Sequence, residues 1–328
     1  MGSTLLIGSC EPFSGKSALV LGLARQLASS GRQVRFGKPL ATSLDWTPEV
    51  GPLPDPLIDD DVRFIGTTLG LKDDQLIPSL HLLAPATADQ RLADGHLQAG
   101  EGFVRLQQQL QSDDETVTLL EAAGSLHEGL LYGLSLGQLA RGLDASVVLV
   151  HLWQDSRSVD ALLAARDQLG ERLAGIVLNA VTPDDVESLQ RHVVPELESL
   201  GLAVFGVMPR SPLLRSVTVG ELVRRLDARV LCCEERLELL VETLSIGAMN
   251  VNSAMEFFRR RRNMAVVTGA DRTDIQLAAL EASTQCLILT GAGEPLPQLI
   301  SRADELEVPL LKVEHDTLAT VEVIEQAF

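Results

Sequence analysis

The feature that most constrains the fold is the junction between an apolar run and a helical pattern near the N-terminus. Residues 4–9 (TLLIGS) predict a buried strand, and residues 16–29 predict a helix. The short loop between them closes with Gly15, Lys16 and Ser17. A strand, a tight loop, and a Lys-Ser pair that opens a helix form the setting in which a phosphate-binding loop works. The sequence therefore predicts a nucleotide site at this junction.

The loop departs from the usual G-x-x-x-x-G-K-[ST] pattern, because Cys10 stands where the first glycine is expected. The side chain of Cys10 narrows the available backbone angles, and Pro12 removes one backbone donor. We expect Gly8, two residues earlier, to take over the turn. Backbone N–H groups and the helix N-terminus favour phosphate oxygens. The predicted nucleotide-binding residues of the loop are Gly8, Glu11, Ser14, Gly15, Lys16 and Ser17. The alternative is an inherited loop that no longer binds.

Short apolar runs alternate with helical patterns along most of the chain. Further strands are predicted at 33–37, 116–121, 146–152, 174–180 and 203–208, and further helices at 101–111, 159–172 and 185–199. The strand runs are continuously apolar, which indicates burial on both faces. The pattern predicts an α/β fold in which a parallel sheet has helices on both faces.

Two segments interrupt this alternation. Residues 45–100 contain several prolines, and we expect a long ordered insertion with one short helix near 60–69. Residues 209–222 are expected to form a linker. Beyond it, strands are predicted at 239–246, 263–267, 285–289 and 308–313, with helices at 250–261, 271–282, 295–306 and 317–326. We therefore expect a nucleotide-binding domain over residues 1–212 and a smaller α/β domain over residues 213–328.

The chain is acidic, with a formal net charge of −18 over 328 residues. Such a balance argues against nucleic acid or an anionic membrane as a partner, since their phosphates need a basic surface. The one basic run, residues 259–262, is expected to lie at a helix C-terminus as a solvated or interface face.

The cysteines also indicate where the protein works. None of the four forms a C-x-x-C pair, and the adjacent Cys232 and Cys233 make a poor disulfide. We therefore expect a reducing compartment. The N-terminus has no basic leader and no long apolar run, and no segment is long and apolar enough to span a bilayer. A cytoplasmic, soluble protein is expected.

Over roughly residues 1–210, the chain resembles dethiobiotin synthetase and the amidating cobyrinate synthases. The resemblance is carried by the loop and by GKPLATS, LLEAAG, GIVLNAV and a late proline. It implies ATP and Mg²⁺ as cofactors. It places Lys38 and Thr42 at the substrate, Glu121 and Ser17 on the metal, and Asn179 and Pro209 at the nucleotide. Lys16 and Lys38 would be the catalytic cations, holding phosphate and acid charge.

An acidic residue of the run 59–61, for which we take Asp59, would complete the metal shell. The alternative for the run is a helix N-cap and first turn. Lys38 could be an ordinary solvated lysine, and Asn179 could serve a turn. Ala122 and Ser43 replace family glycines, and no pattern for a diaminopelargonate substrate is visible in residues 45–100. The six histidines show no metal-ligand spacing and are expected to be structural.

The second half resembles the DRTGG domain, through Asp271-Arg272-Thr273 and Thr290-Gly291, with Ala292 where a second glycine is usual. These residues follow two predicted strands, and Asp271 could cap the next helix. We expect an effector site at Asp271, Arg272, Thr273, Thr290 and Gly291. The alternative is ordinary turn chemistry.

A synthetase-like domain followed by a DRTGG domain resembles the N-terminal, non-catalytic half of long bacterial phosphate acetyltransferases. The resemblance implies a stand-alone regulatory protein without the acetyltransferase domain.

Three functional hypotheses follow. The first is a nucleotide-responsive regulatory or scaffolding protein with weak or no turnover, the second an ATP-dependent ligase that activates a carboxylate or carbamate, and the third a structural oligomerisation module. The expected partners are nucleotide, a second copy of the chain in a homodimer or higher oligomer, and a protein of metabolic regulation.

Overall fold

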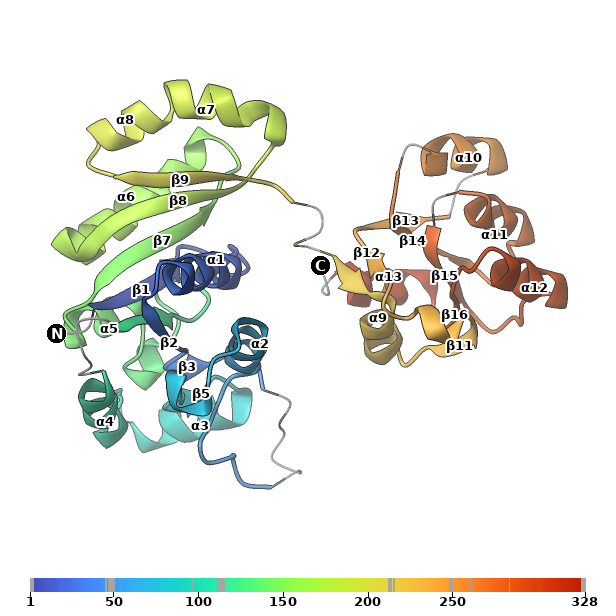
Figure 1. Ribbon diagram of the computed structural model, residues 1–328. Helices are drawn as coiled ribbons and strands as arrows, with labels where there is room; N and C mark the ends of the chain where they lie inside the picture. The colour runs from blue at the N-terminus through green and yellow to red at the C-terminus, as the bar shows by residue number, and fades with distance from the viewer. Residues whose placement is uncertain are drawn as a thin grey trace. The chain divides into compact units, whose positions relative to one another are not determined.

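The computed structural model describes residues 3–44, 46, 51–95, 97–110, 116–211, 214, 216–247, 250–259, 261–282 and 284–325. Its contacts divide the chain into two compact units, Met1–Arg210 and Ser211–Phe328. The colours of Figure 1 separate them, from blue to yellow-green for the first unit and from yellow to red for the second.

The first unit is built on a parallel sheet. In the part of the chain that the structure describes, seven strands pair in the order β4-β2-β6-β1-β7-β8-β9, each parallel to its neighbours. They are β1 (Ser3–Ser9), β2 (Gln33–Gly37), β4 (Leu76–Ile77), β6 (Thr116–Glu121), β7 (Ser146–Leu152), β8 (Leu173–Val181) and β9 (Val204–Pro209). The two-residue strands β3 (Leu40–Ala41) and β5 (His81–Leu82) pair separately. Buried β-branched and leucine side chains line the central strands on both faces, which explains their unbroken apolar runs.

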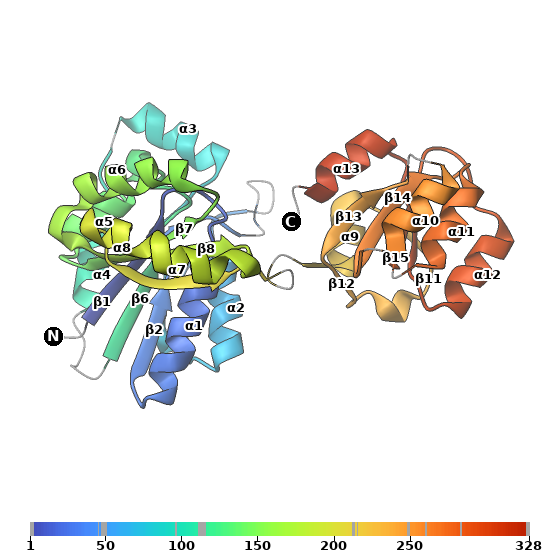
Figure 2. The same ribbon diagram turned by 90° about the horizontal axis from the view of Figure 1, so that it is seen from above.

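Helices cover both faces of this sheet, with α1 and α2 on one side and α5 and α6 on the other (Figure 2). The helices of the unit are α1 (Lys16–Ser29), α2 (Asp60–Leu69), α3 (Pro85–Asp94), α4 (Glu101–Gln109), α5 (Leu136–Gly142), α6 (Val159–Leu169), α7 (Val186–His192) and α8 (Val194–Ser199). After β1 the chain turns to one face of the sheet. After β6, the neighbouring strand, it turns to the opposite face.

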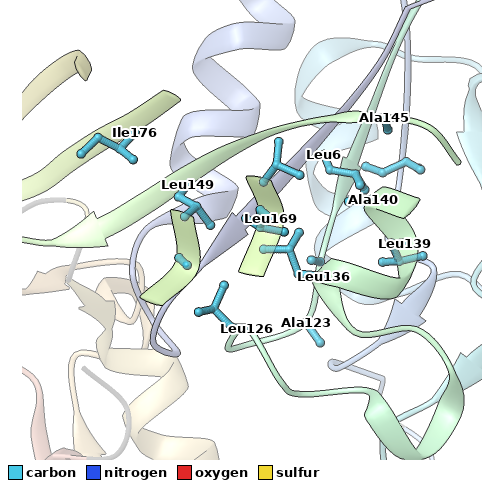
Figure 3. Close-up of a cluster of buried hydrophobic side chains, with 14 of the residues drawn as sticks. Leu6, Ala123, Leu126, Leu136, Leu139, Ala140, Ala145, Leu149, Leu169 and Ile176 are labelled. Atoms are coloured by element: carbon cyan, nitrogen blue, oxygen red, sulfur yellow. The ribbon is translucent and has the colours of Figure 1, made fainter. Parts of the chain in front are cut away.

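The larger core of the unit lies under α5 and α6. Figure 3 shows Leu6 and Leu149 of the sheet packed with Leu136, Leu139 and Leu169 of the helices. Burial of a leucine side chain contributes about 1.5–3 kcal/mol, so that this cluster fixes how the helices that follow β6 and β7 sit on the sheet.

The second unit has a smaller sheet in the order β11-β16-β15-β14-β13, in which β11 runs antiparallel to β16 and the other pairs are parallel. Helices α10, α11 and α12 pack on one face, and α9 and α13 on the other. The strands are β10 (Val217–Thr218), β11 (Arg229–Cys232), β12 (Leu240–Val241), β13 (Thr243–Ile246), β14 (Met264–Gly269), β15 (Thr284–Thr290) and β16 (Leu310–Lys312). The helices are α9 (Val219–Leu226), α10 (Val251–Arg259), α11 (Thr273–Leu280), α12 (Pro297–Glu305) and α13 (Thr317–Glu325).

The predicted α/β class, a parallel sheet covered on both faces and followed by a smaller α/β domain, is confirmed. The insertion contains more structure than predicted, since α3 and the two-residue strands β4 and β5 accompany α2. The linker prediction over 209–222 is wrong at its end, because α9 begins there. Thr218 caps this helix by accepting a hydrogen bond from the Glu221 N–H at 3.1 Å, and Val219 and Leu222 are buried. The Thr-x-x-Glu spacing of Thr218 and Glu221 is typical of a helix N-terminus, so the sequence contained a signal for this helix.

Two predicted elements are each divided in the structure. The helix predicted at 185–199 breaks into α7 and α8 because Pro195, in the first turn of α8, has no N–H to continue the ladder. The strand predicted at 239–246 is interrupted at Glu242, whose N–H donates a hydrogen bond to the Asn263 carbonyl.

Part of the basic run lies outside the described residues. Arg261 stacks on Phe257, with 4.5 Å between the guanidinium carbon and the ring centre. No helix among the described residues combines the length and the apolar character that a membrane crossing requires.

Candidate functional site

The site lies at the carboxyl edge of the large sheet, between β1 and β6. Ile7 of β1 pairs with Glu121 of β6, so the loop after β1 and the residues after Glu121 leave the sheet side by side. The two chain segments then turn to opposite faces, toward α1 and α5 respectively. Ligands of open parallel sheets bind at such a topological switch point.

The loop after β1 is closed by Gly15, which precedes α1 with φ of 93°. This left-handed conformation favours glycine. A Cβ on Gly15 would also lie 2.2 Å from Nδ2 of Asn179. That amide donates a hydrogen bond of 2.7 Å to the Ser14 carbonyl. Asn179, near the end of β8, therefore holds the loop in place. It is the residue that the sequence predicts to contact the nucleotide base.

The other loop residues have distinct surroundings. Gly8 lies inside β1, and a Cβ there would meet Leu136 Cδ2 at 2.3 Å. The prediction that Gly8 supplies the turn is therefore wrong: it makes room for Leu136, and Phe13 and Gly15 carry the positive φ angles of the loop. Phe13 is 95% exposed. Cys10 is half-buried, and its thiol points to the Ala161 carbonyl at 3.6 Å.

Glu11 anchors the loop to the end of β7. Its carboxylate accepts a hydrogen bond of 2.6 Å from the Leu152 N–H and lies 3.2 Å from Nδ1 of the buried His151. These contacts hold the loop in place before any ligand arrives. The sequence did not reveal that His151 lies beside Glu11, because 140 residues separate the two in the chain.

Lys16 is buried, with 7% of its surface exposed. Its ammonium donates hydrogen bonds to Ser9 Oγ at 3.0 Å and to the Gly124 carbonyl at 3.2 Å. Burial lowers the pKa of Lys16, and the nearby Glu121 acts in the opposite direction. Lys16 therefore lies folded between the two loops of the switch point. The sequence did not identify Ser9 or Gly124, because neither carries a charge or breaks the loop pattern.

Ser17 and Glu121 meet at the start of α1. The Ser17 hydroxyl donates a hydrogen bond of 3.2 Å to Glu121 Oε1. The second carboxylate oxygen of Glu121 is buried and has no hydrogen-bond partner among the described residues. Burial raises the pKa of Glu121 to about 7, against the opposing effect of Lys38 and Lys16. A hydroxyl beside a carboxylate with an unused oxygen fits Mg²⁺, which prefers hard oxygen ligands.

Lys38 follows β2 and is surrounded by acidic groups. Its ammonium lies 2.8 Å from Asp61, 3.3 Å from Asp59 and 3.9 Å from Glu121. It also donates to Thr42 Oγ1 at 2.7 Å. Burial alone would lower the pKa of Lys38, but these three carboxylates together raise it. The charge of Lys38 is thus neutralised within the protein.

The acidic run 59–61 forms the N-cap and first turn of α2, which is the alternative left open by the sequence. The carboxylate of Asp59 accepts hydrogen bonds from the backbone N–H groups of Thr42, Ser43 and Asp61. Asp59 is wholly buried, whereas the Asp61 side chain is 44% exposed. Asp61 is therefore the member of the run that is open to solvent beside Lys38.

Pro209 ends β9, where it pairs with Val181 two residues after Asn179. It lies on the same edge of the sheet as the loop. Glu128 was not selected from the sequence, and its carboxylate accepts a hydrogen bond from the Gly124 N–H. It fixes the segment that receives Lys16.

The residues predicted as an effector site follow β14 and β15 of the second unit. The expected capping role of Asp271 is wrong: the N-cap of α11 is Arg272, without a side-chain cap, and Thr273 begins the helix. Arg272 forms an exposed ion pair with Asp274 at 3.4 Å.

The neighbouring strand ends are more buried. Thr290 is buried against Thr317, with 2.7 Å between hydroxyls, and Gly291 has φ of 83°. The sequence did not single out Lys312, which is 2% exposed and donates to the carbonyls of Gly291 and Val313.

Two family descriptions match the chain. Residues 3–218 match an AAA domain, and residues 221–327 match a DRTGG domain. The chain is 24% identical over 351 residues to a phosphate acetyltransferase of Nitratidesulfovibrio vulgaris, covering 100% of this chain and 47% of the relative. It is 26% identical to the phosphate acetyltransferase of Deinococcus radiodurans, covering 97% of this chain and 45% of the relative. The chain thus spans about half the length of these curated relatives.

Solved structures show only a weak likeness. The CBS and DRTGG domains of the regulatory region of Clostridium perfringens pyrophosphatase, complexed with diadenosine tetraphosphate, match with a TM-score of 0.32 and 23% identity, over 35% of this chain and 49% of that one. A McdA–ATP complex from Cyanothece matches with a TM-score of 0.36 and 17% identity, over 64% of this chain and 84% of that one.

The resemblance to the N-terminal half of phosphate acetyltransferases is therefore confirmed, and its two parts are the ones matched here. With an AAA-domain match that covers about two thirds of its length and a DRTGG-domain match after it, the chain belongs to the AAA-domain family of P-loop proteins.

Proposed function

We propose that this protein binds Mg-ATP at the β1–β6 switch point and acts as a nucleotide-responsive regulatory module, with weak or no turnover. The observation that carries the proposal is the convergence of Lys16, Ser17 and Glu121 on one edge of the sheet, with an unused carboxylate oxygen on Glu121. In this proposal Lys16 meets the phosphates, and Ser17 and Glu121 hold Mg²⁺.

The loop itself supports phosphate binding. It is held at two points, by the contact of Glu11 with the Leu152 N–H of β7 and by the contact of Asn179 of β8 with the Ser14 carbonyl. Such preorganisation reduces the ordering cost of binding. Mg²⁺, when bound, would neutralise phosphate charge, and Asp61 rather than Asp59 is our candidate for a further carboxylate near it.

The surroundings of Lys38 favour regulation over a ligase. A ligase of the resembling type needs this lysine for the charge of an acidic substrate. Here Asp59, Asp61 and Glu121 already neutralise it, and a substrate carboxylate would meet three like charges. A purely structural module would have no use for the buried, unpaired oxygen of Glu121, which costs free energy without a partner.

The domain boundary near residue 212, a homodimer and a protein partner in metabolic regulation belong to the same proposal. The named relatives are phosphate acetyltransferases, and an enzyme that catalyses that reaction is the first protein partner to test. The four cysteines are free thiols, which supports a reducing compartment such as the cytoplasm.

Calorimetric titration of the full chain with ATP, with and without Mg²⁺, tests the proposal directly. We expect saturable binding of one ATP per chain that Mg²⁺ strengthens. A lack of heat with either form, checked by nucleotide protection against thermal unfolding, would refute it. Amide exchange that changes at 266–273 and 288–293 when ATP binds would establish coupling to the second unit, and light scattering would give the oligomeric state.

A further inference from the structure

The second unit contains a group of potential metal ligands outside the candidate nucleotide site. Cys232 ends β11, Cys233 follows it, and Asp304 lies in the last turn of α12. The two thiol sulfurs and a carboxylate oxygen of Asp304 all lie within 4.8 Å of one another. Two segments about seventy residues apart in the chain thus bring two sulfur ligands and one oxygen ligand together.

Adjacent residues of a strand normally cannot do this, because successive side chains point to opposite faces. Two irregularities of the backbone change the direction here. The pairing of β11 with β16 shifts between Val230 and Cys232, which places one extra residue, Leu231, on β11. Cys233 then adopts φ of 59°, a left-handed conformation that is unfavourable for a residue with a side chain. Bulges and strained residues of this kind re-aim side chains at functional sites.

The three residues differ in exposure. Cys233 is 5% exposed and Cys232 half-buried, while Asp304 is exposed. Each sulfur faces main-chain carbonyl oxygen, Cys232 at 3.7 Å from Val308 and Cys233 at 4.0 Å from Ala303. Cys233 lies 3.7 Å from Asp304 Oδ1. The surroundings are thus rich in oxygen and acidic, which suits a cation.

The chemistry of the group suits a metal ion. A thiophilic metal ion displaces thiol protons when it binds. Two cysteines and one aspartate are a ligand set that Zn²⁺ and Cd²⁺ accept at a tetrahedral site with a fourth position left for water.

From this geometry we propose that Cys232, Cys233 and Asp304 form a binding site for one thiophilic divalent cation of the zinc class. The site joins the end of β11 to the C-terminal end of α12. Binding therefore stabilises the contact between these two elements, independently of any nucleotide at the first unit.

The test uses the reduced, metal-free full chain titrated with Cd²⁺, whose thiolate complexes absorb in the ultraviolet. We expect this site to give a thiolate-to-metal charge-transfer band whose absorbance stops rising at one equivalent of Cd²⁺ per chain. The band should disappear in a Cys232→Ser/Cys233→Ser double variant. Asp304→Asn should keep the band but weaken binding by about tenfold or more. Cys10→Ser is the matched control, because Cys10 lies near Glu11 and His151 in the other group of potential ligands, and it should leave this band unchanged.

A second measurement needs no variant. Zn²⁺ should protect Cys232 and Cys233 of the native protein from alkylation. The proposal is overturned by a wild-type protein without the band, by an undiminished band in the double variant, or by alkylation of the pair that Zn²⁺ does not slow.

Discussion

The hydroxyl of Ser17 donates a hydrogen bond of 3.2 Å to the carboxylate of Glu121, across 104 residues of sequence. This contact joins the start of α1 to the end of β6. It holds together the two side chains that we propose as Mg²⁺ ligands, at the edge where the phosphate loop opens. The predictions below test what each side of this junction contributes.

Lys16→Ala should weaken ATP binding by roughly ten- to a hundredfold. The change removes a charge-assisted contact to phosphate, which contributes about 1.5–3 kcal/mol. Titration calorimetry gives the affinity. Lys72→Ala is the matched control, since Lys72 is an exposed lysine on the same unit. Equal affinities of the Lys16 variant and the wild type would remove the loop from the proposal.

Glu121→Gln should reduce the affinity for Mg-ATP much more than the affinity for metal-free ATP, because the amide keeps the shape but loses the charge that attracts the ion. The ratio of the two affinities is the quantity to measure. Glu101→Gln, an exposed position on α4, controls for loss of one negative charge. A ratio as large as that of the wild type would contradict the metal assignment.

The stability of the wild type relative to Glu121→Gln should depend on pH. The folded pKa of Glu121, about 7, lies above the ordinary value of 4.5 for a glutamate. The folded state therefore holds the proton more tightly, and this contribution is fully present below pH 4.5 and lost as the pH rises through about 7. The difference in unfolding free energy should change by an amount on the order of 3 kcal/mol. Denaturant unfolding at several pH values measures it, and parallel curves would show that the carboxyl is unperturbed.

Gly15→Ala should abolish nucleotide binding and lower the melting temperature. The left-handed conformation costs about 1–3 kcal/mol for a residue with a side chain, and the new Cβ would meet Asn179. Adding Asn179→Ala should recover part of the stability, because it removes the clash but not the strain. Gly22→Ala is the control: a Cβ there meets nothing within 4 Å, and the helix should gain up to about 1 kcal/mol. If the effects of Gly15→Ala and Asn179→Ala on the melting temperature are additive in the double variant, the predicted clash between the two positions is contradicted.

The sequence was sufficient for the regular parts of the fold. Long apolar runs such as 146–152 and the loop motif depend on local pattern, and both were located within a residue or two. Elements with weaker local signals were missed. The helix α5 has only seven residues, and its amphipathic pattern is too short to separate from a loop.

The site was predictable only in part. Residue type and spacing pointed to Lys16, Ser17 and Glu121, which the structure brings together. Their partners depend on the tertiary path of the chain. The Gly124 carbonyl reaches Lys16 from a segment 108 residues away, and Asp61 reaches Lys38 across 23 residues. The different surroundings of Asp59 and Asp61 follow from the N-cap geometry of α2, which a run of three aspartates does not reveal.

The folded position of Lys16 has a consequence for the affinity of the proposed nucleotide site. Its ammonium already bonds Ser9 and Gly124, so a nucleotide must exchange these bonds for contacts to phosphate rather than add to them. The measured association constant is then the intrinsic one multiplied by the fraction of molecules in which the ammonium is free of these two bonds. At the proposed nucleotide site, the loop would therefore bind phosphate less tightly than the same loop with a free lysine ammonium.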